Sequence, residues 1–316
     1  MDLILNSFGT SLSRDNECFM ILHKDGKQRL PTDGISSIHI NRGAQITSDA
    51  VLLAIEKEIE ILFMNKSGEP VGRVWSNKYG SVSTIRKGQL NFTFSKDAID
   101  WIKEIICQKM ENQQALILTM NADNDADRRR IDKSINMIED YKSKLTGLSG
   151  EVLSDIAPKI RGWEGQASKV YFETLNLFIA QEYQFKSRSQ HPATDIVNAL
   201  LNYGYGILYG KIEGALIKSG IDPYIGVFHR DDYNRPVLVY DVIELSLISQ
   251  NFINDEFYSV KSDGSYWLEG LGRRIIIQSL NDYLDEVIMM KGVSRSRENH
   301  ILLYTQNLAQ YFKKYM

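Results

Sequence analysis

At 316 residues the chain is long enough for two domains on the usual scale of about 100 to 200 residues each. Hydrophobic residues make up 43% and charged residues 24%, a globular composition that excludes a disordered or fibrous chain. The formal net charge of −3 argues against a protein that is basic throughout, so a nucleic-acid partner would have to be held by local basic clusters.

The cysteines and the N-terminus exclude further classes of protein. Cys18 and Cys107 lie far apart and outside any CxxC or Cys/His pattern, which argues against a zinc module and a disulfide framework. The first residues contain neither a basic segment nor a long apolar run, and no stretch reaches the roughly 20 apolar residues of a membrane span. A reducing cytoplasm is the expected location.

Residues 1–90 are expected to form a small β-rich domain. Apolar runs of strand length alternate with turn pairs that favour positive φ, such as Asp25-Gly26 and Asp33-Gly34. These runs are Leu3–Leu5, Cys18–Leu22, Ile35–Ile40, Ile59–Met64 and Val71–Trp75. Ser48 is expected to cap a short amphipathic helix between two of the strands.

Helical periodicity begins at Ser95, which is expected to cap a helix, and it continues through a polar helix that ends at Gly147. The apolar positions that should be buried are Ile99, Ile102, Ile106 and Met110 in the first helix and Ile131, Ile135 and Ile138 in the second. The last third is expected to be helical as well, with one helix over Glu269–Met290. The predicted fold class is therefore α+β, with a β-rich N-terminal domain (1–90) followed by a larger all-α C-terminal domain (91–316).

Two further helices carry unusual residues. A helix of about 20 residues is expected after Pro158 and Gly162, with Glu164 in its first turn. An acid in this position is favoured by the helix dipole, so Glu164 could be a cap without any role in catalysis. The next helix is expected to start at Thr194 and end at Gly220. It contains Gly204, Gly206, Gly210 and Gly214. Each glycine costs about 1 kcal/mol relative to alanine, which suggests that a backbone or ligand approaches this helix closely.

A histidine and two acids follow that helix. A short apolar segment delivers His229 to its end, and the sequence VLVYDVIE then carries Asp241 and Glu244. If this segment is a helix, the two acids project from one face; if it is a strand, they point to opposite faces.

Oxygen ligands suit magnesium and manganese, and manganese also accepts an imidazole. Glu164, His229 and Glu244, with Asp241 beside them, are therefore a candidate site for Mg²⁺ or Mn²⁺ and for phosphodiester chemistry. Spacing alone does not show that these segments meet. Basic clusters that could face DNA, or be solvated surface, are Arg128–Arg130, Lys186 with Arg188, Arg273 with Arg274, Arg295 with Arg297, and Lys313 with Lys314.

Four segments resemble motifs of one known family, in its order and spacing. They are RGWEGQASKVYF (161–172), NALLNYGYGILYG (198–210), GVFH (226–229) and VYDVIE (239–244). The family is the CRISPR adaptation integrase, the first-numbered Cas protein, and the resemblance covers essentially the whole chain. It implies that Glu164, His229 and Glu244 ligate the catalytic metal and that Asp241 lies close to it. Glu244 stands where some relatives have aspartate.

The resemblance also implies which residues meet DNA, because Asn198 and Tyr203 match a pattern that lines the family's active-site region. With the basic residues, the expected DNA contacts are Asn198, Tyr203, Lys211, Arg230, Arg273 and Arg274. The implied activity is metal-dependent DNA integration, in which the 3′-hydroxyl of a double-stranded spacer precursor attacks a phosphodiester at the repeat boundary of a CRISPR array. The implied partners are a second copy of the chain, joined through the N-terminal domain, and a small ferredoxin-like Cas protein.

Two alternatives remain at this point. A relative with the same site could serve a mobile element as its integrase or cleave branched DNA as a nuclease. The same fold could also be a DNA-binding scaffold without catalysis.

Overall fold

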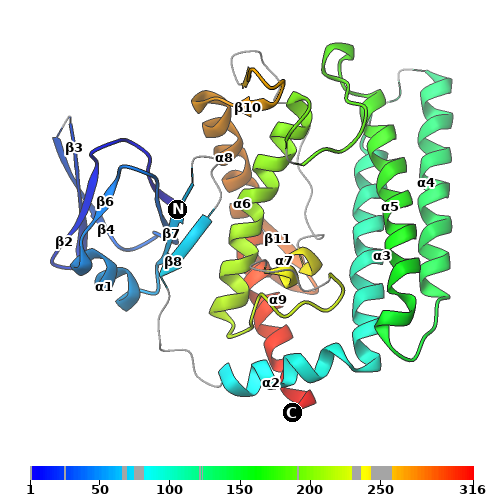
Figure 1. Cartoon of the computed structure of the whole chain (residues 1–316), viewed down its shortest axis with the longest axis horizontal. Coiled ribbons are helices and arrows are strands. Elements are labelled where there is room, and N and C mark those ends of the chain that lie inside the picture. The colour runs from blue at the N-terminus through cyan, green and yellow to red at the C-terminus, as the bar shows by residue number, and fades with distance from the viewer. Residues whose placement is uncertain are drawn as a thin grey trace. The chain divides into compact units, whose positions relative to one another are not determined.

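The computed structural model describes residues 2–24, 26–65, 70–74, 82–120, 122, 124–190, 192–229, 236–242 and 258–316 (Figure 1). The chain divides into two compact units, Met1–Gly80 and Ser81–Met316. The first is β-rich, and the described residues of the second are helical apart from two short hairpins, which confirms the α+β class. Among the described residues, no helix combines the length and the apolar character needed to cross a membrane.

The N-terminal unit contains two four-stranded sheets. One has the order β1 (Asp2–Leu5), β5 (Ser37–Ile40), β7 (Glu60–Met64), β8 (Pro70–Val74), and the other has the order β4 (Gly26–Pro31), β3 (Cys18–His23), β2 (Ser11–Asp15), β6 (Gln45–Ile46). β5 and β7 are parallel, so the chain needs a crossover, which α1 (Ser48–Glu56) provides. The cap of α1 is Thr47, one residue before the expected Ser48, because its hydroxyl accepts the Ala50 N–H at 3.3 Å.

The apolar runs predicted as strands do form strands, and they enclose a core with α1. Leu12, Phe19, Ile38, Leu53 and Ile61 are fully buried in it. The strands that the sequence did not indicate, β2, β4 and β6, are short or mostly polar, and β4 is almost wholly exposed. Strands without an apolar alternation leave little signal in a single sequence.

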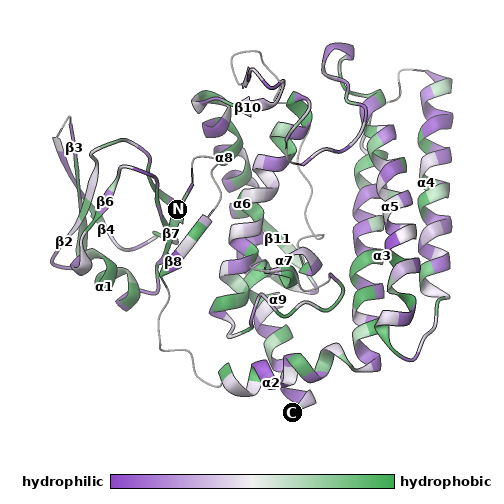
Figure 2. Ribbon diagram, viewed as in Figure 1, coloured by the Kyte–Doolittle hydropathy of each residue, from purple (hydrophilic) through white to green (hydrophobic). Residues whose placement is uncertain are grey.

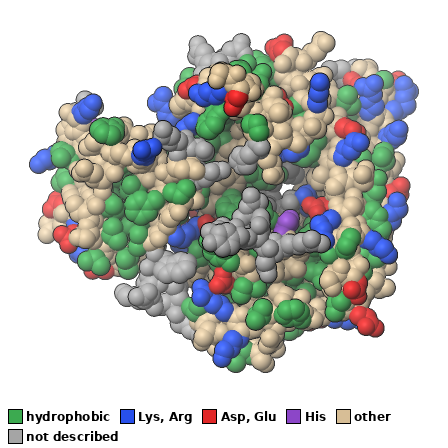
Figure 3. Space-filling view, in the orientation of Figure 1, with side chains coloured by type: hydrophobic (Ala, Val, Ile, Leu, Met, Phe, Trp, Pro, Cys, Tyr) green, Lys and Arg blue, Asp and Glu red, His purple; other side chains and the backbone are tan. Residues whose placement is uncertain are grey.

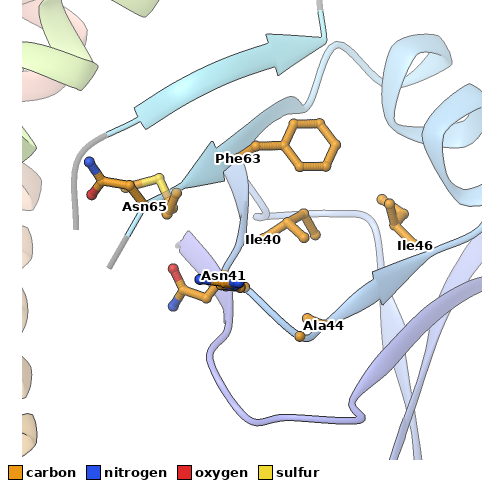
Figure 4. A pocket seen from close by; sticks show the side chains of 9 residues that line it. Ile40, Asn41, Ala44, Ile46, Phe63 and Asn65 are labelled. Atoms are coloured by element: carbon orange, nitrogen blue, oxygen red, sulfur yellow. The ribbon is translucent and has the colours of Figure 1, made fainter. Parts of the chain in front are cut away.

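The N-terminal unit also exposes apolar side chains (Figure 3). Phe8 is 82% exposed and Val71 is 69% exposed. A pocket in the same unit is lined by Ile40, Asn41, Arg42, Gly43, Ala44, Ile46, Phe63, Met64 and Asn65 (Figure 4). Gly43 has a φ of +92°, and a Cβ there would lie 2.5 Å from the Phe8 ring, so Phe8 packs directly over this turn.

In the helical unit, α3 (Lys96–Leu118), α4 (Asp125–Thr146) and α5 (Leu153–Leu177) run side by side (Figure 1). Ser95 caps α3, and Gly147 ends α4, as predicted. The core between these helices includes Ile102, Met110, Ile138 and Ile160, all fully buried. α4 alternates hydrophilic and hydrophobic positions because only one of its faces is buried (Figure 2).

The second helical group surrounds α6 (Ile196–Lys218). Its other members are α2 (Val82–Thr93), α7 (Val237–Val242), α8 (Gly270–Asp285) and α9 (Arg297–Phe312), with the short 3₁₀ turns η1 (Gln181–Tyr183) and η4 (Lys313–Tyr315). α2 packs against the C-terminus so closely that a Cβ on Gly88 would lie 2.0 Å from the Phe312 carbonyl oxygen. For this reason α2 belongs to the helical unit, whereas the sequence placed the boundary near residue 90.

Several sequence expectations for this unit are wrong in detail. The helix expected over Glu269–Met290 stops at Asp285, and a hairpin of β11 (Val287–Met290) and β12 (Val293–Ser296) follows, because Gly292 with a φ of +79° allows a tight turn. A second hairpin joins β9 (Tyr258–Val260) to β10 (Tyr266–Leu268). The cap of α6 is Asp195 rather than Thr194. A Cβ on Gly206 would meet nothing within 4 Å, so close approach does not explain that glycine.

Candidate active site

His229 is held by the carboxylate of Asp241. The distance from His229 Nδ1 to Asp241 Oδ1 is 2.6 Å, and the same carboxylate accepts the backbone N–H groups of Val227, Phe228 and His229 at 2.9, 3.1 and 3.1 Å. The Asp241 side chain is fully buried, whereas that of His229 is 36% exposed. With Nδ1 turned to the carboxylate, Nε2 is the ring nitrogen that can offer a lone pair to a cation.

α7 brings Asp241 to this position. The segment VLVYDV forms a six-residue helix, so Asp241 lies on a helix and not on a strand. Gly226 allows the close contact, since a Cβ there would lie 2.7 Å from Val237 and 2.8 Å from the His229 carbonyl oxygen. The ring of Tyr240 lies 5.7 Å from the imidazole and limits its movement.

The turn that precedes His229 is fixed by α2. Gln89 is fully buried, and its amide donates to the carbonyls of Asp222 at 2.7 Å and Ile225 at 3.0 Å. Its oxygen accepts the N–H of Asp222 at 3.0 Å. The loop therefore has hydrogen-bond support at both ends, from Gln89 on one side and from Asp241 on the other.

Glu164 lies in the middle of α5, not at its start. The helix begins at Leu153, because Pro158 sits in the second turn without ending the helix, so a cap role for Glu164 is excluded. Its carboxylate forms an ion pair with Lys109 of α3, with Nζ and Oε1 2.7 Å apart. The two side chains are 14% and 16% exposed, so the pair is largely shielded from water.

Arg161 connects α5 to the histidine segment. Its Nη1 donates to the Phe228 carbonyl at 3.3 Å, and its guanidinium lies 5.4 Å from the centre of the Phe228 ring. Arg161 precedes Glu164 by three residues, which places both on one side of α5. Arg161 thus links α5, the helix of Glu164, to the segment of His229, in which Val227 contacts both hydrophobic cores.

Two of the expected site residues, Glu244 and Arg230, lie outside the described residues. Within the described ranges there is no group of three His, Cys, Asp or Glu side chains that could hold a metal ion. Both oxygens of Asp241 accept hydrogen bonds from the loop and one also contacts the His229 ring, so Asp241 orients His229 and is not arranged as a metal ligand itself.

The expected DNA-contacting residues fall into two groups. Asn198 is fully buried, and the Lys211 ammonium forms an ion pair with Glu298 at 3.0 Å. Both side chains therefore make contacts within the protein. Tyr203 is half-buried beneath the Arg273 guanidinium, 6.0 Å from its ring centre, and burial raises the pKa of its phenol. Arg274 is exposed on α8. Of the expected DNA contacts that the structure describes, Tyr203 and Arg273 are half-buried and Arg274 is exposed, so these three keep surface for a ligand.

The model of the family described as CRISPR associated protein Cas1 matches residues 3–282 of the chain. The chain belongs to the Cas1 family. This confirms the family expected from the four motifs.

Curated Cas1 proteins resemble the chain over most of its length. The CRISPR-associated endonuclease Cas1 1 of Archaeoglobus fulgidus is 29% identical over 336 residues, which cover 99% of this chain and 96% of the relative. The CRISPR-associated endonuclease Cas1 1 of Methanospirillum hungatei is 31% identical over 212 residues, which cover 67% of this chain and 61% of the relative.

Solved structures share the fold. A Cas1 protein from Thermotoga maritima aligns with a TM-score of 0.76 at 18% identity and covers 98% of this chain and 96% of its own. A chain of a Cas6-RT-Cas1–Cas2 complex aligns with a TM-score of 0.77 at 19% identity and covers 99% of this chain and 35% of its own.

Several residues that build the site of this Cas1 chain were not found from sequence. Lys109, Arg161 and Gln89 occupy ordinary positions on predicted or unnoticed helices, where each would be taken for a solvated side chain. Their roles depend on contacts with residues 55, 67 and 133 positions away. Such long-range contacts leave no mark on local spacing.

Proposed function

We propose that this Cas1 protein is a metal-dependent DNA integrase that inserts double-stranded spacer precursors into a CRISPR array. The observation that carries the proposal is the buried Asp241 carboxylate that fixes Nδ1 of His229, in a chain matched by the Cas1 family model. A histidine oriented by a carboxylate is typical of a metal ligand. The relatives named endonucleases support chemistry on phosphodiesters.

The donor set suits a hard divalent cation. Glu164 would supply a carboxylate oxygen and His229 would supply Nε2, with Glu244 as the third ligand expected from the sequence; this set suits Mn²⁺ or Mg²⁺ better than zinc. When bound, the cation would neutralise charge on the phosphate and favour ionisation of the attacking hydroxyl. Asp241 keeps the imidazole in one tautomer, and Lys109 holds Glu164 in place before a cation binds.

The proposed reaction is a transesterification. The 3′-hydroxyl oxygen of the precursor forms a bond to phosphorus at the repeat boundary, and the bond from that phosphorus to the neighbouring 3′ oxygen of the array breaks. The hydroxyl loses a proton and the departing oxygen gains one, so the number of phosphodiester bonds is unchanged. No oxidant or nucleotide cofactor is needed for this exchange.

The test is strand transfer by purified protein into a repeat-bearing plasmid with Mn²⁺ or Mg²⁺. We expect Glu164→Ala and His229→Ala to fall below about 1% of the wild-type rate while keeping the fold, since the loss of a ligand exceeds the 10- to 100-fold typical of its supporting residues. Circular dichroism and DNA binding in the absence of metal serve as controls. Full activity in either variant would remove that residue from the ligand set.

A second candidate is integration on behalf of a mobile element. A casposase bound to its integration product aligns with this chain at a TM-score of 0.63 and 20% identity, so the same fold occurs in such an enzyme. The two functions differ in the target sequence. Equal insertion into repeat-bearing and unrelated plasmids would favour the mobile-element function over the array.

We also propose that two copies of the chain pair through the N-terminal unit. The exposed Phe63 lines a pocket there (Figure 4), Phe8 lies beside Gly43 of the same pocket, and Val71 is a further exposed apolar residue of the unit. Because Phe8 is 82% exposed, Phe8→Ser should leave the stability of a single chain nearly unchanged. We expect the dimer dissociation constant to rise about tenfold, measured by sedimentation equilibrium, since one buried aromatic contributes about 1 to 3 kcal/mol to an interface.

A small ferredoxin-like Cas protein is the proposed further partner. Solved structures that share this fold include chains of Cas6-RT-Cas1–Cas2 complexes, which supports assembly of this kind. Co-purification of the chain with that partner from the same gene cluster, and the mass of the complex, would test it.

A further inference from the structure

Arg188 is held in a fixed orientation beside α6. Its Nη1 donates to Asn198 Oδ1 at 2.9 Å and to the Ser189 carbonyl at 2.6 Å. The guanidinium lies 5.8 Å from the centre of the Tyr205 ring, a distance at which cation–π attraction acts. An arginine with one nitrogen bonded and its plane near an aromatic ring loses little further entropy when it binds an anion.

Asn198 is the residue that holds it. Its side chain is fully buried, and its oxygen also accepts the Ser189 N–H at 2.9 Å. Its nitrogen donates to the Ser187 carbonyl at 2.9 Å and to Asp195 at 2.7 Å, so every hydrogen-bonding position of the amide is used. Asn202 adds a bond to the Ser189 carbonyl at 3.2 Å. The loop is thus fixed around the guanidinium by two asparagines of α6.

Among the described residues Arg188 has no ion-pair partner, since its acidic neighbour, Asp195, accepts the amide of Asn198 instead. In the described part of the chain it has no carboxylate within ion-pair distance, and Nε and Nη2 have no acceptor. Lys109 and Lys211, by contrast, are each paired with a glutamate. Burial lowers the pKa of Arg188, but arginine stays charged at neutral pH. A half-buried guanidinium with two nitrogens still able to donate attracts an anion more strongly than an exposed lysine does.

Arg188 also lies near the active-site helix. The loop that carries Arg188 packs on α5, since the Phe185 ring lies 6.2 Å from the Phe172 ring and the Phe185 N–H donates to Asn176 at 2.9 Å. Phe172 follows Glu164 by eight residues, which is roughly 12 Å along the axis of α5. Successive phosphates advance by about 3.4 Å per nucleotide along a duplex, so this separation corresponds to a few nucleotides of one strand.

We propose that Arg188 binds a backbone phosphate of the DNA a few nucleotides from the reacting phosphodiester, and that Asn198 is a positioning residue that fixes the guanidinium for this contact. The inference rests on the proposed function, because it takes DNA as the ligand. It adds a binding residue outside the metal site and assigns Asn198 a role through Arg188, with no direct contact to DNA.

The test is the salt dependence of DNA binding in EDTA, so that no catalysis is required. The probe is a fluorescent branched duplex, titrated at several KCl concentrations. We expect Arg188→Gln to lower the slope of log K against log [KCl] by about 0.9, the value for one phosphate contact on duplex DNA. Lys186→Gln is the matched control, since Lys186 is exposed in the same loop, and its slope should stay at the wild-type value.

Arg188→Lys keeps the charge but loses the planar fork, so it should keep the wild-type slope and bind more weakly. Arg188→Lys also tests the proposal if thermal unfolding shows that Arg188→Gln does not fold. An unchanged slope in Arg188→Gln, an equal fall in Lys186→Gln, or wild-type affinity in Arg188→Lys would each overturn the proposal. Wild-type protein that binds DNA with a normal slope but never transfers strands would instead contradict the proposed function.

Discussion

The two carboxylates of the proposed active site, Asp241 and Glu164, are held in opposite ways. Asp241 is fully buried and bonded to three backbone N–H groups and an imidazole, all within one loop and its helix. Glu164 has a single lysine partner on another helix. The hydrogen bonds from backbone groups to a carboxylate cannot break without unfolding the loop, whereas a lysine side chain can move away when a cation binds the carboxylate. The site therefore combines one permanent support with one exchangeable contact.

The largest expected effect on stability is at the permanent support. Asp241→Asn replaces an oxygen by an NH₂ group among backbone donors, so we expect a loss of unfolding free energy on the order of 3 kcal/mol and a 10- to 100-fold fall in strand transfer. Glu164→Gln should cost far less stability. Urea denaturation of both variants measures the difference, and equal losses would mean that the two carboxylates are not held differently.

Residue spacing and motifs could predict the fold class, the helices that begin at Ser95 and end at Gly147, and the family. They could not predict α2, because the burial of VSTIRKGQLNFT depends on contacts with the C-terminal end of the chain. The pairing of His229 with Asp241 was indicated only as proximity. Its geometry follows from a loop that closes on its own carboxylate, which depends on Gly226 and on the turn of α7.

A smaller effect is expected where α2 supports the same loop. Gln89→Leu removes three hydrogen bonds to the turn at Asp222 and Ile225 and leaves buried backbone groups unpaired. We expect a loss of about 2 kcal/mol in stability and a several-fold fall in strand transfer. Asn91→Ala is the control on the same helix, since Asn91 bonds the Tyr315 carbonyl and not the loop. If Asn91→Ala lowers activity as much as Gln89→Leu, the loss of activity would come from a change in α2 as a whole and not from the lost hydrogen bonds to the loop.

The smallest effect should come from the exchangeable contact. Lys109→Met removes a cation that competes for Glu164, so Mn²⁺ affinity should rise about tenfold while the metal-free protein loses about 1 kcal/mol. Lys103→Met is the control on α3, because Lys103 bonds only backbone carbonyls near Thr146 and Leu148. Isothermal titration with Mn²⁺ gives the affinity. A weaker Mn²⁺ affinity in Lys109→Met would show that the lysine supports the cation instead of competing with it.

The most direct measurement of the central claim, that Glu164 and His229 together hold a divalent cation, is Mn²⁺ binding followed by electron paramagnetic resonance. The account predicts that wild-type protein takes up the ion at this site and that Glu164→Gln and His229→Ala each weaken its binding at least tenfold, with the fold intact by circular dichroism. Wild-type Mn²⁺ affinity in both variants would contradict it.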